Sequence, residues 1–227
     1  MTDRQSVTRR PGVRARRDDR RRALLEAARR RFLADGYEGT SVAAIVREAG
    51  VAQGTFYLYF RSKEHVLLHL RAEVLASYQA ALEAGAAGEG LADERLLRGL
   101  ERIGREVRRH HALLRVFRQA AGGLETERVR LEGRAALAAP LARLIAAGEA
   151  DGSLFADDPT MAAHLLLALL DDLVYEALEY GRPAPAGETL AHAGRFMLRA
   201  LGAPEARVAA LRPLGRRRAR REAGGGE

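Results

Sequence analysis

The chain of 227 residues contains no cysteine and no tryptophan, and it has one lysine among its 38 Lys and Arg residues. Without cysteine it can form no disulfide, no thiolate metal site and no thiol redox switch. Its longest apolar run, residues 165–170, is far shorter than the ~20 residues that a membrane-spanning helix needs. The basic first 22 residues lack the apolar segment of a signal peptide. We therefore expect a soluble, cytoplasmic protein.

Alternation of apolar and polar residues, the pattern of a half-buried strand, is also missing, and no internal repeat is present. Apolar residues recur instead at helical spacing along most of the chain, which predicts an all-α fold of about nine helices. The first helix is expected to start at a cap on Asp18 or Asp19 and to end at Asp35-Gly36. Later helices are expected at about 62–82, 96–114, 125–147 with a kink at Pro140, 159–180 and 188–201, with a loop and domain seam at 84–91.

The most specific pattern is TSVAAIVREAGVAQGTFYLYFRSK at residues 40–63. Thr40 can cap a short helix, and Gly50 stands where a left-handed residue would end it. A second short helix follows, with Phe56 and Phe60 on its apolar side and hydrogen-bonding side chains on the other. Two packed helices joined by a glycine turn form the unit that places its second helix in the DNA major groove.

Charge is concentrated at the two ends of the chain. Of the net charge of +8, residues 1–22 carry +6 and residues 202–227 carry +4, which leaves −2 for the remainder. Basic ends suit neutralisation of DNA phosphates, with a salt-dependent gain in affinity. The alternative is a pair of disordered, solubilising tails, which we favour for the glycine-rich C-terminal end.

From about Arg20 to Leu70 the sequence resembles the DNA-binding domain of the tetracycline-repressor (TetR/AcrR) family of bacterial regulators. The resemblance is carried by FLADGYEGTSV, AGVAQGTFYLYF and SKE, in that order and without gaps. It implies a three-helix DNA-binding domain followed by a helical ligand-binding and dimerisation domain. We accordingly expect a basic arm at 1–17, a DNA-binding domain at 18–70 with its helix-turn-helix at 40–60, a second domain at 71–203 and a basic, disordered tail at 204–227.

Side-chain chemistry and the resemblance agree on the residues that would meet DNA. The amide of Gln53 can bond adenine in the major groove, and Thr55 offers a methyl to thymine or a hydroxyl to phosphate. Gly54 leaves room for close approach, and Lys63, the single lysine, is expected at a phosphate. The full expected set is Thr40, Ser41, Gln53, Gly54, Thr55, Tyr57, Tyr59 and Lys63. Core packing of Tyr57 and a solvated surface role for Lys63 are the alternatives.

Residues 165–170 would be apolar on every side of a helix, so every side must be covered. One side can pack on the chain's own core and the other on a second copy, although burial inside a monomer would also satisfy the pattern. The resemblance implies the same pairing of the last two helices, and a two-fold dimer matches paired half-sites on DNA. The expected interface residues are Leu166, Leu170, Leu173, Leu190, Ala193 and Met197.

The resemblance implies that the second domain holds a small molecule whose entry releases DNA. The pocket is expected to be lined by Ile103, Val107, His110, Leu114, Phe117, Ile145 and Leu169. Arginines between 105 and 118 crowd the same region, and they belong either to a solvated helix face or to the mouth of a pocket for an anionic amphiphile such as an acyl thioester of coenzyme A.

The expected function is thus a dimeric, ligand-responsive transcriptional repressor that binds a palindromic operator. The runner-up is a non-inducible DNA-binding dimer whose C-terminal half serves association or protein partners. A helical enzyme is a remote alternative, because no nucleophile, phosphate loop or carboxylate pair is placed convincingly. His65 and His69 stand four apart and could ligate a metal, but a third ligand is lacking, so no metal and no cofactor are expected.

Overall fold

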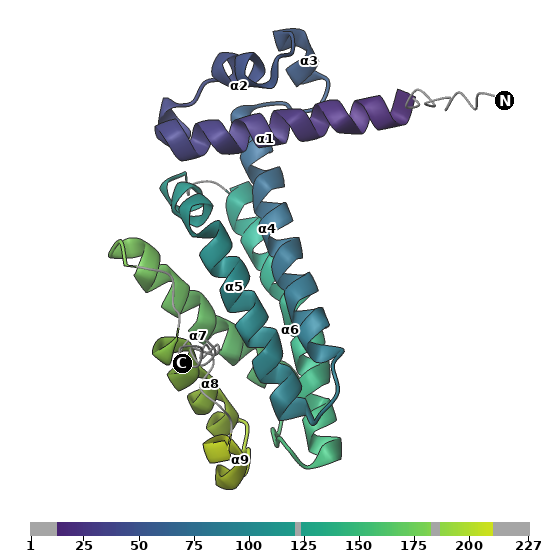
Figure 1. Ribbon diagram of the computed structural model, residues 1–227, viewed down its shortest axis with the longest axis vertical. Coiled ribbons are helices and arrows are strands. Elements are labelled where there is room, and N and C mark those ends of the chain that lie inside the picture. The colour runs from purple at the N-terminus through teal and green to yellow at the C-terminus, as the bar shows by residue number, and fades with distance from the viewer. Residues whose placement is uncertain (1–12, 121–123, 183–186, 211–227) are drawn as a thin grey trace, which may run out of the picture. The chain divides into compact units, whose positions relative to one another are not determined.

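The computed structural model describes residues 13–120, 124–182 and 187–210, and the side chains of 13–16, 124–127 and 130 are left aside (Figure 1). Within these residues the chain forms nine helices and no strand, which confirms the all-α prediction. It divides into two compact units, residues 1–70 and 71–227, so the loop after residue 86 lies inside the second unit. Among the described residues, no helix combines the length and the hydropathy needed to cross a membrane.

The first unit is built on α1 (Val13–Gly39), against which α2 (Val42–Ala49) packs. Leu24, Leu25 and Phe32 are buried as their spacing predicts, whereas Leu33 is exposed. The helix begins at Val13, so the prediction of a cap at Asp18 or Asp19 and of an arm through residue 17 is wrong. Gly36 breaks α1 where expected, because its φ of 74° lies in the left-handed region that favours glycine.

The cap of α2 differs from the prediction. The hydroxyl of Ser41 accepts a hydrogen bond from the backbone N–H of Ala44 at 3.1 Å, so Ser41 and not Thr40 is the N-cap. Gly50 ends the helix at φ 66°, as the left-handed stop requires. The one-turn α3 (Gln53–Tyr57) follows, and α4 (Lys63–Ala86) begins beyond it.

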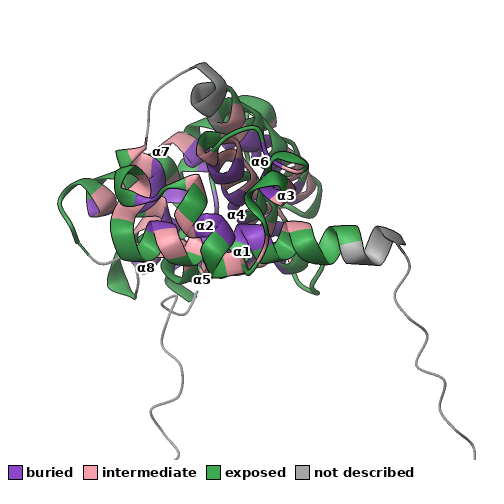
Figure 2. Cartoon of the chain, turned by 90° about the horizontal axis from the view of Figure 1, so that it is seen from above, coloured by how far each residue is buried: buried purple, intermediate pink, exposed green. Residues whose placement is uncertain are grey.

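The second unit contains the rest of α4 and the helices α5 (Ala92–Gln119), α6 (Leu124–Asp151), α7 (Pro159–Glu179), α8 (Glu188–Ala200) and α9 (Glu205–Ala210). Its core joins α5, α6, α7 and α8 through leucines such as Leu96, Leu141 and Leu198. α6 is longer than predicted and continues through Pro140. Buried and exposed positions succeed one another along the helices, so each helix has a packed side and a solvent side (Figure 2).

The apolar run of α7 separates into two faces. Asp158 caps the helix and Pro159 occupies its first turn, as predicted. Leu166 is 5% exposed, whereas its neighbour Leu165 is 63% exposed. Within one chain the run is therefore only partly covered, and one side of α7 presents apolar side chains to solvent.

The short α9 contradicts the prediction of a disordered tail from residue 204. Arg207 in α9 forms two hydrogen bonds with the carboxylate of Asp93, at 2.5 and 2.7 Å. Asp93 is fully buried at the start of α5, so this ion pair anchors α9 to a point 114 residues earlier. The basic segments 1–12 and 211–227, and the predicted break at Gly122-Gly123, lie outside the described residues.

Candidate DNA-binding face and interior groove

The one-turn helix α3 has an anchored side and an exposed side. Phe56 and Phe60 are buried, with ring centroids 5.7 Å apart, and they hold α3 in the core of the first unit. Gln53 and Tyr57 project outward as predicted, and Tyr57 is 56% exposed. Thr55 and Tyr59 are half-buried, and Gly54 is exposed with open space beside its Cα. The arrangement presents an amide and a phenol on one exposed surface.

The two residues before α2 have different environments. Ser41 is exposed while its hydroxyl caps the helix. Thr40 is 1% exposed, and its hydroxyl donates a hydrogen bond to the carbonyl oxygen of Gly36 at 2.7 Å. The predicted contact of the Thr40 hydroxyl with DNA is therefore not supported, because that hydroxyl lies inside the domain. The sequence pattern alone did not distinguish the two adjacent hydroxyls.

Lys63 lies at the start of α4 and makes contacts within the protein. Its Nζ donates to the carbonyl oxygens of Tyr37 at 2.9 Å and Thr40 at 3.3 Å, and it lies 4.3 Å from the centre of the Tyr37 ring. The side chain is neither a fully solvated charge nor a free cation. It connects α4 to the turn between α1 and α2, so it supports the position of the helix-turn-helix.

A polar cleft in the first unit was not anticipated from the sequence. It encloses about 750 Å³, part of it open solvent, and is lined by Arg17, Asp18, Arg21, Leu58 and Tyr59. Two guanidinium groups from α1 thus lie beside the residues that follow α3. Helical spacing places Arg17 and Arg21 on one face of α1, and that spacing is the signal that could have identified them.

His65 and His69 lie side by side, with ring centroids 4.7 Å apart. Nδ1 of His65 accepts the backbone N–H of Arg61, and Nδ1 of His69 accepts from the Arg21 guanidinium at 3.1 Å. Burial, the charge of Arg21 and the neighbouring His65 lower the pKa of His69. Among the described residues, no three side chains of the types that bind metals are grouped together.

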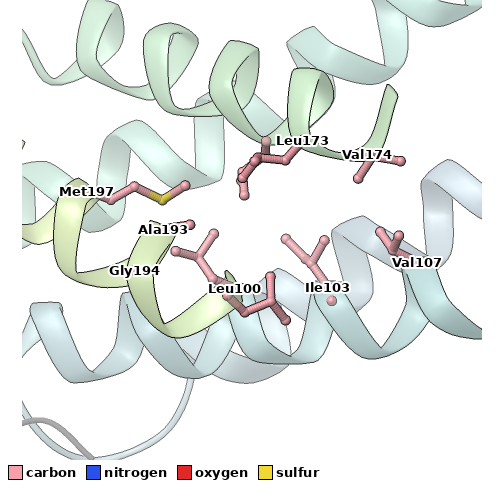
Figure 3. A pocket seen from close by; sticks show the side chains of 11 residues that line it. Leu100, Ile103, Val107, Leu173, Val174, Ala193, Gly194 and Met197 are labelled. Atoms are coloured by element: carbon pink, nitrogen blue, oxygen red, sulfur yellow. The ribbon is translucent and has the colours of Figure 1, made fainter. Parts of the chain in front are cut away.

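The second unit contains an apolar groove between α5, α7 and α8 (Figure 3). The groove encloses about 540 Å³, part of it open to solvent. No lining residue carries a polar side chain: the walls are Leu100, Ile103, Gly104, Val107, Leu170, Leu173, Val174, Leu190, Ala193, Gly194 and Met197. In Figure 3 the side chains of Ile103 and Leu173 approach the space from opposite walls. The groove can therefore accept an apolar group.

The predicted pocket residues divide into two sets. Ile103 and Val107 line the groove. Phe117 and Ile145 are buried in the packed interior, where Phe117 lies under the Arg71 guanidinium at 5.2 Å. His110, Leu114 and Leu169 are half-buried and do not line the groove itself. The seven predicted residues therefore do not line one pocket. The apolar residues of α5 shift gradually around the helix, so those near its start and those near its end contact different neighbours.

The six residues predicted for a dimer contact are buried or half-buried within one chain. Leu166 and Met197 are buried inside one chain, and Leu170, Leu173, Leu190 and Ala193 line the groove with Met197. None of these six is an exposed side chain. The large apolar side chains that α7 and α8 expose are Met161, Leu165, Tyr175 and Phe196. The place of the six predicted residues in a dimer contact stays a prediction, and the exposed side chains are further candidates for it.

The arginines of α5 lie mainly on its solvent side. Arg105 is exposed and bonds Glu101 at 3.0 Å. Arg118 is partly buried, where it forms an ion pair with Glu179 and lies 3.9 Å from the centre of the Tyr175 ring. Neither of these two arginines lines the groove.

Comparison with known proteins adds the family context. Residues 24–70 match the family described as "Bacterial regulatory proteins, tetR family". The chain is 34% identical over 73 residues to the fatty acid metabolism regulator protein of Bacillus subtilis, an alignment that covers 32% of this chain and only 38% of that relative. The chain thus spans little more than a third of the length of this curated relative.

Two solved structures extend the similarity over most of the chain. A transcriptional regulator of the TetR/AcrR family from Thermobifida fusca is 27% identical, with a TM-score of 0.64 and coverage of 79% of this chain and 97% of that one. The regulator FadR from Bacillus subtilis, solved in complex with stearoyl-CoA, is 22% identical, with a TM-score of 0.64 and coverage of 79% of this chain and 96% of that one. At that identity the second likeness shows a shared fold.

Proposed function

Because the chain belongs to the tetR family of bacterial regulatory proteins, we propose that it is a dimeric transcriptional repressor that binds a palindromic operator and is released by a small molecule. The observation that carries this proposal is the exposed polar face of α3, held on two buried phenylalanines. Such a face suits the major groove, where an amide can recognise a base.

On this proposal Gln53 contacts a base edge, Gly54 allows close approach, and Tyr57, Thr55, Tyr59 and the Ser41 end of α2 contact the sugar-phosphate backbone. Arg17 and Arg21, at the polar cleft, supply further positive charge for phosphates. Lys63 acts mainly by holding α4 against the α1–α2 turn. The expected consequence is a binding affinity that falls steeply with salt.

The dimer would form through the exposed apolar side chains of α7 and α8. Met161 and Leu165 are one helical turn apart on α7, and Phe196 is 60% exposed on α8. Covering such side chains with a second copy removes apolar surface from water, which is the main driving force for association. A two-fold dimer presents two copies of α3, as two half-sites of a palindrome require.

The effector would enter the groove between α5, α7 and α8. Its walls favour an elongated apolar molecule, and the stearoyl-CoA complex of the related-fold regulator makes that compound a rational first probe. A ligand shifts a conformational equilibrium only as far as it binds one state better than the other. The effector must therefore favour a form of the second unit that is incompatible with operator binding.

The test has two stages. Duplexes bound by the full chain are first selected from random DNA, and we expect enrichment of an inverted repeat. The complex with the selected duplex is then titrated with stearoyl-CoA and a panel of apolar compounds, with release followed by fluorescence anisotropy. Equal binding of all sequences would contradict the DNA-reading role. Selective binding that no compound reverses would favour a non-inducible DNA-binding dimer.

A further inference from the structure

Arg21 of α1 lies at the polar cleft of the first unit and contacts two other side chains there. Its Nη2 is 3.1 Å from Nδ1 of His69 on α4, and its guanidinium carbon is 5.8 Å from the centre of the Phe60 ring. Phe60 is buried, and its ring centre is 5.4 Å from that of His69. The three side chains therefore form one group of mutual contacts.

The hydrogen bond between Arg21 and His69 fixes the protonation state of the imidazole. A guanidinium can only donate, so Nδ1 of His69 accepts and the ring proton lies on Nε2. Protonation of Nδ1 would place an N–H opposite the guanidinium and a second positive charge beside it. His69 is therefore neutral as long as Arg21 donates to it.

The groups that act on His69 favour this neutral form. Burial, followed by the charge of Arg21 and the neighbouring His65, lowers the pKa of His69. His65 lies one turn earlier on α4, and its own Nδ1 accepts the backbone N–H of Arg61 at 3.2 Å. The cleft beside Arg21 is also lined by Arg17, Asp18, Leu58 and Tyr59. The charge of Arg21 is thus the largest electrostatic cause of the low pKa, and an anion bound to Arg21 would offset it.

The side chains that line the cleft suit a phosphate group. Arg17 lies one turn before Arg21 on the same face of α1, so two guanidinium groups can donate to one anion. Tyr59 is half-buried in the cleft and can donate from its phenol. Asp18 is one carboxylate against two guanidinium groups, so the cleft remains cationic. Because Tyr59 follows α3, the proposed DNA-reading helix, the anion nearest to this cleft would be a backbone phosphate of DNA.

We propose that Arg21 binds a DNA phosphate in this cleft and that His69, which then loses its hydrogen-bond donor, takes up a proton from solvent on Nδ1. This inference rests on the proposed DNA-binding function. In the free chain the guanidinium occupies Nδ1 of His69. In the complex the phosphate competes for the N–H groups of Arg21 and neutralises its charge. His69 is thus a positioning residue for Arg21, and it links DNA binding to pH.

Linkage fixes the sign of the expected effect. The complex holds one proton more than the separate chain and duplex, so a fall in pH favours the complex. One proton taken up over a full pH unit changes the affinity tenfold. At constant ionic strength we therefore expect DNA to bind about tenfold more tightly at about pH 5.5 than at about pH 8.

Anisotropy titrations of the full chain with one duplex across this pH range measure the effect. His69→Gln retains an amide oxygen that can accept from Arg21 but does not titrate, so it should bind like wild type at pH 8 and lose the pH dependence. Arg21→Gln should weaken binding about five- to tenfold, lower the salt slope by about one and lose the pH dependence as well.

Matched controls are available on the same two helices. Arg17→Gln removes the other guanidinium of the cleft, so it should lower the salt slope while the pH dependence remains. His65→Gln removes the neighbouring imidazole and should also leave the pH dependence in place. Circular dichroism at each pH verifies that every variant is folded. A wild-type pH profile in His69→Gln would overturn the proposal, as would a wild-type affinity that stays constant or falls as the pH drops.

The outcome is separable from that of the proposed function. Phosphate contacts carry no sequence information, so the pH effect should appear on an unrelated duplex as well as on the selected one. If the chain selects an inverted repeat but His69→Gln keeps the wild-type pH profile, the repressor stands and the proton linkage is wrong. If the chain selects no sequence but shows a pH effect that depends on His69, the repressor proposal fails and the phosphate site stands.

Discussion

The candidate DNA-binding face of α3 and the groove of the second unit differ in the side chains that they present. On α3, Gln53 and Tyr57 are exposed above buried phenylalanines, and the turns around them have their hydrogen bonds satisfied. In the second unit the groove between α5, α7 and α8 is lined by residues without polar side chains. The first region offers hydrogen-bonding side chains to a partner, whereas the second offers apolar contacts.

The largest expected effect contrasts two adjacent leucines of α7. Leu166→Arg buries an unpaired charge in the core and should cost on the order of 3–5 kcal/mol, enough to unfold the second unit. Leu165→Arg changes an exposed residue and should leave the helix content intact while abolishing the proposed dimer. Circular dichroism and light scattering measure the two outcomes, and a dimeric Leu165→Arg protein would contradict the assigned face.

The second-largest expected effect concerns the ion pair that anchors α9. Arg207→Ala leaves the buried Asp93 carboxylate without its guanidinium, which should destabilise the second unit by about 2–3 kcal/mol. Arg199→Ala breaks a solvent-exposed pair with Glu205, which water screens, and should have a much smaller effect on stability. Equal losses in urea titrations of the two variants would show that the buried pair does not hold α9 in place.

These helices also show where sequence reasoning succeeds and fails. The helix-turn-helix is local, so Gly50, Phe56 and Phe60 identify it within 24 residues. The six-residue α9 has too short an apolar pattern to be recognised, and it is held by a partner 114 residues away. Leu165 and Leu166 are chemically identical, so only the packing of α5 and α6 decides which of them is buried. Likewise, only the folded structure distinguishes the buried hydroxyl of Thr40 from the capping hydroxyl of Ser41.

At the DNA-binding face, Gln53→Ala should weaken operator binding by about 1–3 kcal/mol and relax the preferred sequence. Lys63→Ala removes a cation that bonds two backbone oxygens within the first unit, so it should lower thermal stability as well as affinity for all sequences. Anisotropy titrations on matched and mismatched duplexes distinguish the two variants. An unchanged sequence preference in Gln53→Ala would remove α3 from base recognition.

The smallest effect is a pH dependence of the first unit. The pKa of His69 is lowered in the folded protein, so the unfolded chain binds a proton more readily. The contribution of the neutral His69 to the stability of the first unit is therefore fully present above the unfolded pKa of about 6.5. It is lost as the pH falls below that value toward the lower folded pKa. His69→Gln should flatten this dependence, whereas His192→Gln, at an exposed position, should not. Thermal melts between pH 5 and 8 provide the measurement.

Two chains are expected to bind one palindromic duplex. The mass of the complex between the full chain and its selected duplex, measured by light scattering, should correspond to the DNA plus twice 24.8 kDa, or an even multiple of the chain. A duplex that retains one half-site should bind far more weakly. One chain per palindromic duplex, with affinity unchanged when a half-site is removed, would contradict the account.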